Sequence, residues 1–353
     1  MKPKKILVIR FRQMGDAILA TPLLNTLHAQ FPDADIDLVL NDHLAPVFEG
    51  HPAISHIITF TYKERHSFFT YLRKVWKTMR QTCYDAIIDM RSTISTMYFT
   101  LFSLRSRYRI GIRKPYTKII FNYRYEGCGA DESMIDHNLR LAEPLIGNDK
   151  TKTIRSLTLP LNDEEYNDFH SYMERQGIDF NRPVMLVGVT AKLENKTWAE
   201  DRMTEILLRL IKTYPKWQFV FNYAPGKEAE NAHRIYDNLC EKLPAAADTC
   251  FLNIEARCPR QLLAMAVCCT AYFGNEGGAR HIVYAMGRPS FVICSPMASK
   301  ATWLPHDTNV LTQGIAASDL TDTTGMTYEQ QYNLITVDEV WSRLHAFCEE
   351  LHI

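Results

Sequence analysis

The chain has 353 residues, of which 46% are hydrophobic, and its 40 basic residues balance 40 acidic ones. Such a length exceeds what one hydrophobic core usually organises, so two domains are expected, and the charge balance gives no argument for nucleic-acid binding. No apolar run approaches the roughly 18 residues of a membrane span, and the first residues lack a hydrophobic signal core. The composition therefore predicts a soluble, cytoplasmic protein whose membrane contact is at most peripheral.

The N-terminal segment predicts a buried strand followed by a helix. Residues 4–11 are rich in β-branched and apolar side chains and run into Arg12-Gln13-Met14-Gly15-Asp16. One apolar face follows at helical spacing, formed by Ala20, Leu23, Leu24, Leu27 and Phe31. Asp16 is therefore expected at the carboxyl end of a first parallel strand, where open α/β sheets bind ligands. Pro22 either kinks a helix that begins near Gly15 or is the first residue of a helix that Thr21 caps. For Asp16, the alternative to a ligand contact is a structural role as a helix cap.

Two further segments of the first half are unusual in composition. Phe68, Phe69, Tyr71, Leu72, Val75 and Trp76 form an aromatic helical stripe among basic residues, which predicts core packing or, alternatively, an interfacial helix. Residues 105–124 carry seven basic side chains and no carboxylate. This basic run is either a solvated face or a site for an anionic acceptor or a phosphate-bearing membrane surface.

The middle of the chain predicts a domain boundary. Residues 148–155 are polar, as expected of a linker, and a short strand is predicted at 157–159. Asn162 with Glu165 predicts a capping box that opens a helix ending near Gly177. Residues 184–189 then repeat the pattern of the first strand, which indicates two Rossmann-like halves.

The segment 270–296 predicts a strand, a glycine-rich loop and a helix. Residues 270–273 end the strand, Gly277 and Gly278 permit a close turn, and residues 279–286 form the helix. The free N–H groups and the dipole at such a helix start suit a phosphate. Nine cysteines occur without a Cys-x-x-C pair, which predicts buried thiols rather than a zinc site.

Six motifs occur in a fixed order, from residue 4 to about residue 305: Met14-Gly15-Asp16 with Thr21-Pro22, residues 84–89, residues 109–111, Lys196-Thr197-Trp198, residues 274–278 with His281, and residues 285–289. Together they resemble glycosyltransferase family nine, the ADP-heptose:lipopolysaccharide heptosyltransferases. The chain departs from that family's Asp-Ser/Thr-Gly loop, because it has Glu276-Gly277-Gly278 and places Arg280 before the histidine.

The resemblance implies an α/β fold of GT-B architecture, with two Rossmann-like domains and a nucleotide-sugar cleft between them. Residues 1–155 would form the acceptor-binding domain and residues 156–332 the nucleotide-sugar-binding domain. Residues 333–353 would contain a helix that crosses back to the first domain. The expected substrates are an ADP-heptose-like donor and an anionic lipopolysaccharide-core acceptor, used on or beside the inner membrane.

A single displacement that inverts the anomeric carbon needs a base and a stabiliser of the diphosphate. Asp16 is the predicted base. The predicted donor contacts are Thr190, Lys196, Glu228, Glu276, Gly277, Gly278, Ala279 and His281. Lys192 is an alternative to Lys196, Glu230 is an alternative to Glu228, and Arg280 is a further candidate. The predicted acceptor contacts are Arg12, Arg109 and Arg113. The Asp33-Ala-Asp35 sequence falls in a helix-to-strand turn, so no metal and no other cofactor is predicted.

Three rival functions remain at this point. A protein of the same fold could bind nucleotide sugars without transferring them, for which the altered 276–278 loop is the motive. A sugar epimerase could share the two-domain plan, because fold does not fix function. A Rossmann oxidoreductase would need Gly-x-Gly-x-x-Gly after the first strand, where this chain has only Gly15.

Overall fold

The computed structural model describes residues 2–129, 131–297, 299–304 and 309–352, and of Glu194 only the backbone. Residue 305, where the family resemblance was expected to end, lies outside these ranges. The chain divides into two compact units, Met1–Pro160 and Leu161–Ile353. The observed division therefore falls five residues after the expected one.

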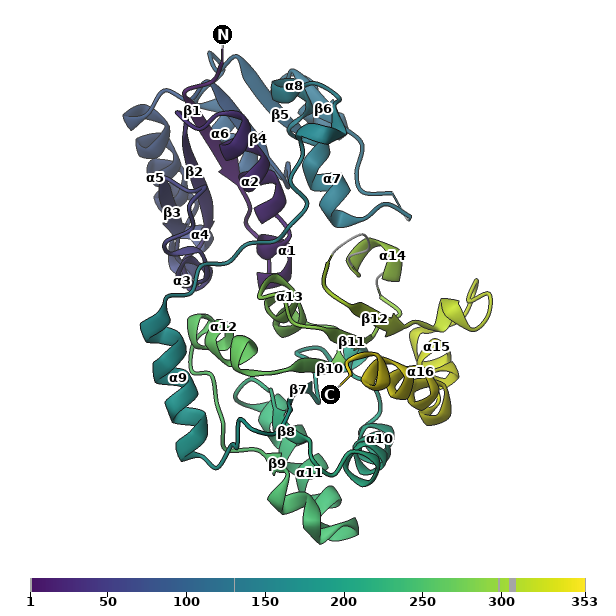
Figure 1. The fold of residues 1–353 in the computed structure, drawn as a ribbon. Coiled ribbons are helices and arrows are strands. Elements are labelled where there is room, and N and C mark those ends of the chain that lie inside the picture. The colour runs from purple at the N-terminus through teal and green to yellow at the C-terminus, as the bar shows by residue number, and fades with distance from the viewer. Residues whose placement is uncertain (1, 130, 298, 305–308, 353) are drawn as a thin grey trace. The chain divides into compact units, whose positions relative to one another are not determined.

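The first unit is a six-stranded parallel sheet with the strand order β3-β2-β1-β4-β5-β6 (Figure 1). Its strands are β1 (Lys5–Ile9), β2 (Asp35–Asn41), β3 (His56–Phe60), β4 (Ala86–Asp89), β5 (Tyr108–Ile112) and β6 (Tyr123–Tyr125). Its helices are α1 (Met14–Ile18), α2 (Thr21–Gln30), α3 (Ala45–Phe48), α4 (Tyr62–His66), α5 (Phe68–Gln81), α6 (Ile94–Leu101), α7 (Met134–Arg140) and α8 (Glu143–Ile146), with 3-10 turns at Asp42–Leu44, Pro115–Thr117 and Lys150–Lys152.

The second unit repeats this plan, with the strand order β12-β11-β10-β7-β8-β9. Its strands are β7 (Val184–Gly188), β8 (Gln218–Phe221), β9 (Cys250–Phe251), β10 (Ala271–Asn275), β11 (Ser290–Ile293) and β12 (Thr312–Ile315). Its helices are α9 (Asp163–Arg175), α10 (Glu200–Thr213), α11 (Lys227–Lys242), α12 (Pro259–Cys268), α13 (Gly278–Ala285), α14 (Lys300–Trp303), α15 (Tyr328–Leu334) and α16 (Val337–Glu350), with 3-10 turns at Glu194–Lys196, Pro244–Asp248 and Ala317–Asp319.

Both sheets reverse their strand order at one point, between β1 and β4 in the first unit and between β7 and β10 in the second. In each sheet, the strands that follow the first one are added on one side of it and then on the other. This reversal leaves a gap at the carboxyl ends of the two central strands. Helices depart from that gap toward opposite faces, so ligands bind there in open α/β sheets. Functional side chains are therefore expected at these two switch points.

Local sequence accounts for most helix boundaries. The apolar face predicted after Gly15 is buried, from Ala20 to Phe31. This face belongs to α2 and its two flanking residues, because α1 ends at Ile18 and Pro22 lies in the first turn of a separate helix. Thr21 is the first residue of α2 and donates its hydroxyl to the Ile18 carbonyl at 2.8 Å, so it does not cap the helix. The capping box of Asn162 and Glu165 opens α9 as predicted.

The strand predicted at 157–159 is wrong. The segment is extended and its Leu157 and Leu159 are buried, but no strand of the described residues pairs with it. Side chains of α2 bind its backbone instead: Asn25 Nδ2 donates to the Ser156 carbonyl at 3.0 Å, and Thr26 Oγ1 accepts from the Ile154 N–H at 2.8 Å. Because α2 satisfies these backbone groups, the segment crosses a helix without joining a sheet.

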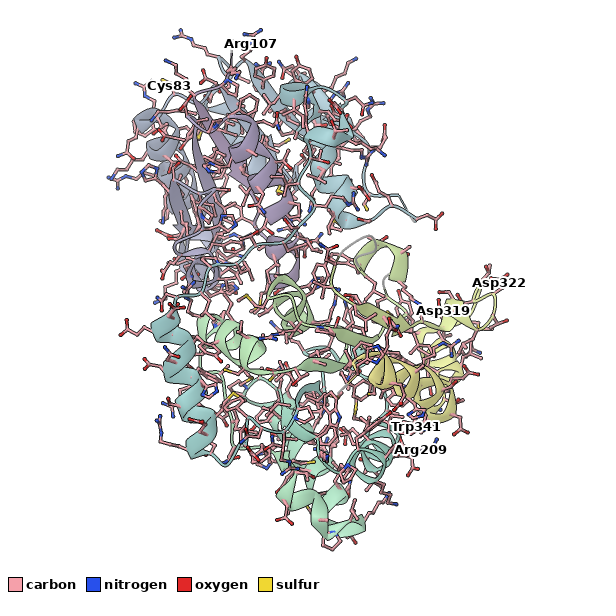
Figure 2. All side chains as sticks on the ribbon, viewed as in Figure 1. Cys83, Arg107, Arg209, Asp319, Asp322 and Trp341 are labelled. Atoms are coloured by element: carbon pink, nitrogen blue, oxygen red, sulfur yellow. The ribbon has the colours of Figure 1, made fainter. Side chains whose placement is uncertain are left out.

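The C-terminal helix α16 was expected to cross back to the first domain, but in the structure its apolar face lies in the second unit. Val340, Leu344 and Phe347 are fully buried in a core that also contains residues of α10, α11 and the sheet. Arg209 of α10 pairs with Asp338 of α16 at 2.7 Å (Figure 2 labels Arg209). Residues 337–350 are therefore part of the fold of the second unit.

The expectation of buried thiols holds for five of the nine cysteines. Cys83 and Cys258 are exposed, because they lie in the loop after α5 and at the residue before α12 (Figure 2 labels Cys83). Within the described residues, no helix has the length and apolar character needed to cross a bilayer.

Candidate active site

Asp16 is held by two arginines at the switch point of the first sheet. It lies in α1, directly after β1, and is only 6% exposed. Arg10 donates from NH2 to Asp16 Oδ1 at 2.8 Å and from Nε to the Asp16 carbonyl at 3.1 Å, while Arg12 Nε lies 3.4 Å from Oδ2. Burial lowers the pKa of Arg10 to about 10, and the nearby Asp16 charge opposes that shift. The carboxylate therefore binds arginines and does not cap the helix.

More cations lie along the same edge of the sheet than the sequence motifs indicated. Arg91 follows β4 and donates to the Phe11 carbonyl at 2.8 Å, and Lys114 follows β5 and donates to the Arg91 carbonyl at 3.1 Å. Arg65 of α4 stacks over the Phe11 ring at 4.7 Å. Burial lowers the pKa of Arg91, and the neighbouring Arg12 and Arg65 charges lower it further. Asp16 therefore lies in a basic environment that suits an anionic substrate.

The basic side chains of residues 105–124 have different environments. Arg109 is part of the scaffold: its guanidinium donates to the carbonyls of Ile120, Leu104 and Ser106 at 2.8 to 2.9 Å. Arg113, which follows β5 at the carboxyl edge, is exposed and pairs with Glu126 at 3.0 Å. Of the two predicted acceptor contacts in this run, Arg113 is exposed and Arg109 is only partly exposed.

In the second unit, one asparagine fixes the two loops at the switch point. Asn275 donates from Nδ2 to the Gly188 carbonyl at 3.0 Å and accepts the Trp198 N–H at 2.8 Å, so it joins the ends of β10 and β7. Gly274 has φ +144°, and a Cβ there would lie 2.4 Å from the Gly188 oxygen. This close approach requires glycine. Sequence analysis missed the role of Asn275, although its place at a strand end was a usable signal.

Glu276 and Lys196 form an ion pair next to these loops. Lys196 Nζ lies 3.3 Å from Glu276 Oε1, and Glu276 Oε2 accepts the Ser295 N–H at 3.2 Å. Glu276 is 8% exposed, whereas Lys192 is exposed and has no such partner among the described residues. Thr190 is buried at the end of β7, and its hydroxyl has no hydrogen-bond partner in the described part of the chain. The structure thus brings three predicted donor contacts to one switch point.

The start of α13 presents open donors at the same place. Gly277 precedes the helix and offers no side-chain cap, so the N–H groups of Gly277, Gly278 and Ala279 have no acceptor among the described residues. The next residue, Arg280, is 1% exposed and donates from NH2 to the Trp303 carbonyl at 2.8 Å, while its Nε and NH1 have no described partner. A buried guanidinium with unused donors, beside an open helix start, suits an anion.

His281 is buried in α13 as a neutral ring. Its Nε2 lies 3.1 Å from Arg280 NH2, which has only protons to offer, so Nε2 accepts and Nδ1 carries the imidazole proton. Burial lowers the pKa of His281 well below its usual value, and the Arg280 and Lys196 charges lower it further. Nδ1 has no partner within the described residues, which leaves one N–H for a ligand.

The remaining predicted donor contact lies after β8. Glu228 is in the first turn of α11 and accepts the Ala224 N–H at 3.3 Å, whereas Glu230 is exposed. The capping contact orders the loop that follows β8. The sequence left the choice between these two carboxylates open, and of the two Glu228 is the one bound to the loop after β8.

A cluster of possible metal ligands lies at α7 and in the loop before it. Ligand atoms of Cys128, Glu132 and His137 lie within 4.8 Å of one another, but Arg140 contacts Glu132 at 2.8 Å and His137 at 3.1 Å. A cation there would have to displace a guanidinium that already neutralises the carboxylate, so the residues do not fit a metal.

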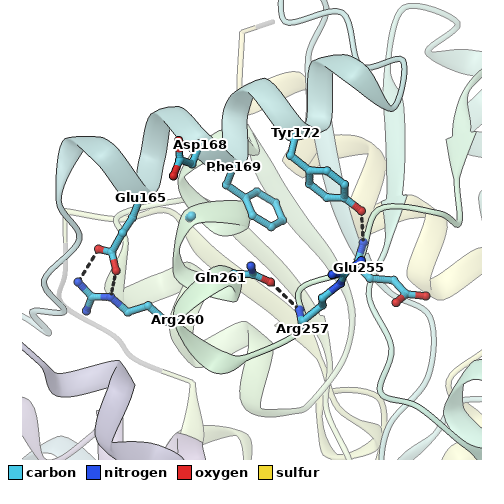
Figure 3. Close-up of a pocket in the computed structure, with 9 residues that line it drawn as sticks. Glu165, Asp168, Phe169, Tyr172, Glu255, Arg257, Arg260 and Gln261 are labelled. Atoms are coloured by element: carbon cyan, nitrogen blue, oxygen red, sulfur yellow. Dashed lines mark hydrogen bonds and ion pairs between the residues drawn. The ribbon is translucent and has the colours of Figure 1, made fainter.

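A cavity of about 440 Å³ lies between α9 and α12 (Figure 3). Its wall carries three carboxylates, from Glu165, Asp168 and Glu255, and two guanidinium groups, from Arg257 and Arg260. Arg260 is bound to both oxygens of Glu165 at 2.5 and 2.6 Å. This excess of negative charge does not suit a diphosphate, and no predicted donor residue lines the cavity.

The proteins and solved structures that are similar to this chain include several heptosyltransferases. Lipopolysaccharide heptosyltransferase 1 of Campylobacter coli is 21% identical over 303 residues, which cover 82% of this chain and 83% of that protein. The structure of E. coli ADP-heptose lps heptosyltransferase II superposes with a TM-score of 0.75 at 21% identity, covering 99% of this chain and all of the other. E. coli heptosyltransferase WaaC with ADP-2-deoxy-2-fluoro heptose gives 0.68 at 13% identity, covering 97% and 99%.

The paired Rossmann-like sheets define an α/β protein of GT-B architecture, the fold that these solved structures share. Residues 72–314 match the sequence pattern of one such group over more than two thirds of the chain. The chain belongs to glycosyltransferase family 9 (heptosyltransferase).

Proposed function

We propose that this chain is an inverting transferase that moves a heptose-like sugar from an ADP-linked donor to an anionic lipopolysaccharide-core acceptor, in the cytoplasm on or beside the inner membrane. One observation carries the proposal. In each unit, the polar residues that such a reaction needs follow the two strands that flank the switch point. The names of the related heptosyltransferases support the sugar and the acceptor, and the ADP-sugar analogue in the WaaC structure supports the nucleotide.

The first unit would hold the acceptor. Arg12, Arg91 and Lys114 supply positive charge around Asp16, and Arg113 extends it along the edge. Asp16 uses one position on each carboxylate oxygen for an arginine. A carboxylate has about four lone-pair sites, so an acceptor hydroxyl can still donate to it.

The second unit would hold the donor. The N–H groups at the start of α13, together with Arg280 and Lys196, would bind the diphosphate. Glu276 would release Lys196 to the phosphate and accept hydroxyls of the sugar, while Glu228 would accept those of the ribose. Thr190 and His281 each retain one unused hydrogen-bonding group for the same ligand.

Transfer would then proceed in one displacement. The acceptor oxygen forms a bond to the anomeric carbon as the bond from that carbon to the diphosphate oxygen breaks. The hydroxyl proton passes to Asp16, and the released electron pair stays on ADP. Donors aimed at the leaving phosphate stabilise the charge as it develops, which is usually a large part of catalysis.

The test combines nucleotide binding with transfer. ADP at a hundred times its Kd should stabilise the chain by about 2.7 kcal/mol, whereas UDP and GDP should do less at equal concentration. Purified chain should also release ADP from ADP-heptose only when a lipopolysaccharide-core acceptor is present. If UDP or GDP stabilises the chain as well as ADP does, the proposed donor is wrong. Binding of ADP without any transfer would favour the rival role as a nucleotide-sugar-binding protein.

A further inference from the structure

The aromatic stripe of α5 is divided between two opposite faces of the helix. Tyr71, Val75 and Met79 are buried in the core of the first unit, as the core-packing interpretation predicted. Phe68, Phe69 and Trp76 are instead 55%, 82% and 50% exposed. Three large aromatic side chains on one 14-residue helix therefore remain in contact with solvent, which is unusual for a surface that binds nothing.

Exposed aromatic and basic side chains alternate along one face. Phe69, Arg73, Trp76 and Arg80 follow one another at spacings of four, three and four residues, which places them on the same side of a helix. The guanidinium of Arg80 lies over the Trp76 ring at 5.6 Å. We call these four residues the α5 stripe.

The charge around the α5 stripe has one sign. Between residues 62 and 81 there are six basic side chains and a single carboxylate. That carboxylate, Glu64, is bound by Lys74 at 2.7 and 2.8 Å and does not neutralise the stripe. Since α5 itself contains no acidic residue, its exposed face is both aromatic and cationic.

We propose that the α5 stripe docks on an anionic lipid surface. Phenylalanine and tryptophan favour the boundary between headgroups and acyl chains, and arginine and lysine bind lipid phosphates at the same depth. A second copy of the chain fits less well, because pairing two stripes would bring like charges together. The proposal rests on α5 alone and does not depend on the proposed transfer.

Docking there would bring the acceptor edge of the sheet toward the lipid. Arg65, just before α5, stacks on Phe11 and donates to Asn41 Oδ1 at 2.5 Å, so α4 connects the stripe to the loops around Asp16. An acceptor anchored in the bilayer would then meet the first unit without leaving the membrane.

The experiment uses the full chain and vesicles of phosphatidylcholine, with or without phosphatidylglycerol. The wild type should sediment with the anionic vesicles, less so at high salt, and its tryptophan emission should shift to the blue. Phe69→Ser with Trp76→Ser, and separately Arg73→Glu with Arg80→Glu, should each weaken binding by about tenfold or more. Ile119→Ser removes an apolar side chain that is 88% exposed outside the stripe, and should bind as the wild type does.

The controls separate docking from folding, self-association and activity. All replaced side chains are exposed, so the thermal midpoint and ADP affinity should not change. Equal binding by the wild type and the Phe69/Trp76 variant, or no preference for anionic vesicles, would overturn the proposal. It would also be overturned if the wild type is a dimer that this variant converts to a monomer while neither binds vesicles. Vesicle binding is measured without donor or acceptor, so its failure would leave the proposed transfer standing.

Discussion

Replacing Asp16 by asparagine should remove catalysis and, at the same time, cost stability. The general-base role predicts that kcat falls by about 10² to 10⁴, which corresponds to about 3 to 5 kcal/mol of barrier. The structure adds a second effect, because the Asp16 carboxylate balances Arg10 at 2.8 Å and both side chains are buried. Removing one partner of such a pair costs about 3 to 5 kcal/mol. Asparagine retains an oxygen, and Arg10 still donates to the Asp16 and Met90 carbonyls, so we expect about 2 to 3 kcal/mol.

Asp37 provides the matched control for this stability effect. It is a carboxylate of the same sheet, also 6% exposed, and it accepts from the Tyr84 hydroxyl at 2.6 Å. It lies four residues before the carboxyl end of β2, away from the predicted site. Asp37→Asn should therefore destabilise the first unit without reducing kcat.

The assay measures transfer rate, ADP affinity by calorimetry and denaturant unfolding for wild type and both variants. The expected pattern is that both variants unfold more readily, both bind ADP normally, and only Asp16→Asn loses turnover. Turnover by Asp16→Asn above about a tenth of the wild-type rate would show that Asp16 is structural. The base assignment would also be refuted if both variants lost turnover in proportion to their loss of unfolding free energy.

Three further predictions follow from the sites described. Lys196→Ala should weaken ADP binding by about 1 to 3 kcal/mol, measured by calorimetry, whereas Lys192→Ala should not; the reverse result would exchange their roles. Arg113→Glu should raise the KM for the acceptor, more at low salt than at high salt, and should leave ADP affinity unchanged. An unchanged KM would show that Arg113 is a solvated surface charge that does not contact the acceptor. Burial and the Arg140 charge lower the pKa of His137 from 6.5 to about 4, so the unfolded state binds the extra proton between these values. Stability should therefore fall as pH falls through this range, by up to about 3 kcal/mol from this group, and denaturant titrations of His137→Gln should show a shallower fall; an equal slope would contradict the assignment.

The sequence determined those features that depend on neighbours in the chain. The apolar period after Gly15, the capping box at Asn162 and the strand at residues 184–188 agree with the structure, because helical spacing, capping and strand patterning act over a few residues. The positions of Asp16 and Glu276 at strand ends also followed from this local order. The repeated strand pattern indicated two Rossmann-like halves, and the family resemblance added their GT-B architecture, which the structural comparisons confirm.

Tertiary structure alone decided which charged side chains meet. Lys196 and Glu276 are 80 residues apart in the chain, and Arg91 reaches Phe11 across the same separation, so no local pattern reports either contact. It also decided the environment of Arg109, whose acceptor contact stays a prediction. In the sequence that arginine is one cation in a basic run, but the fold surrounds its guanidinium with three carbonyl groups. The sequence gives the charge of a side chain. Its hydrogen-bond and ion-pair partners depend on which strands, far apart in the chain, lie next to each other in the parallel sheet.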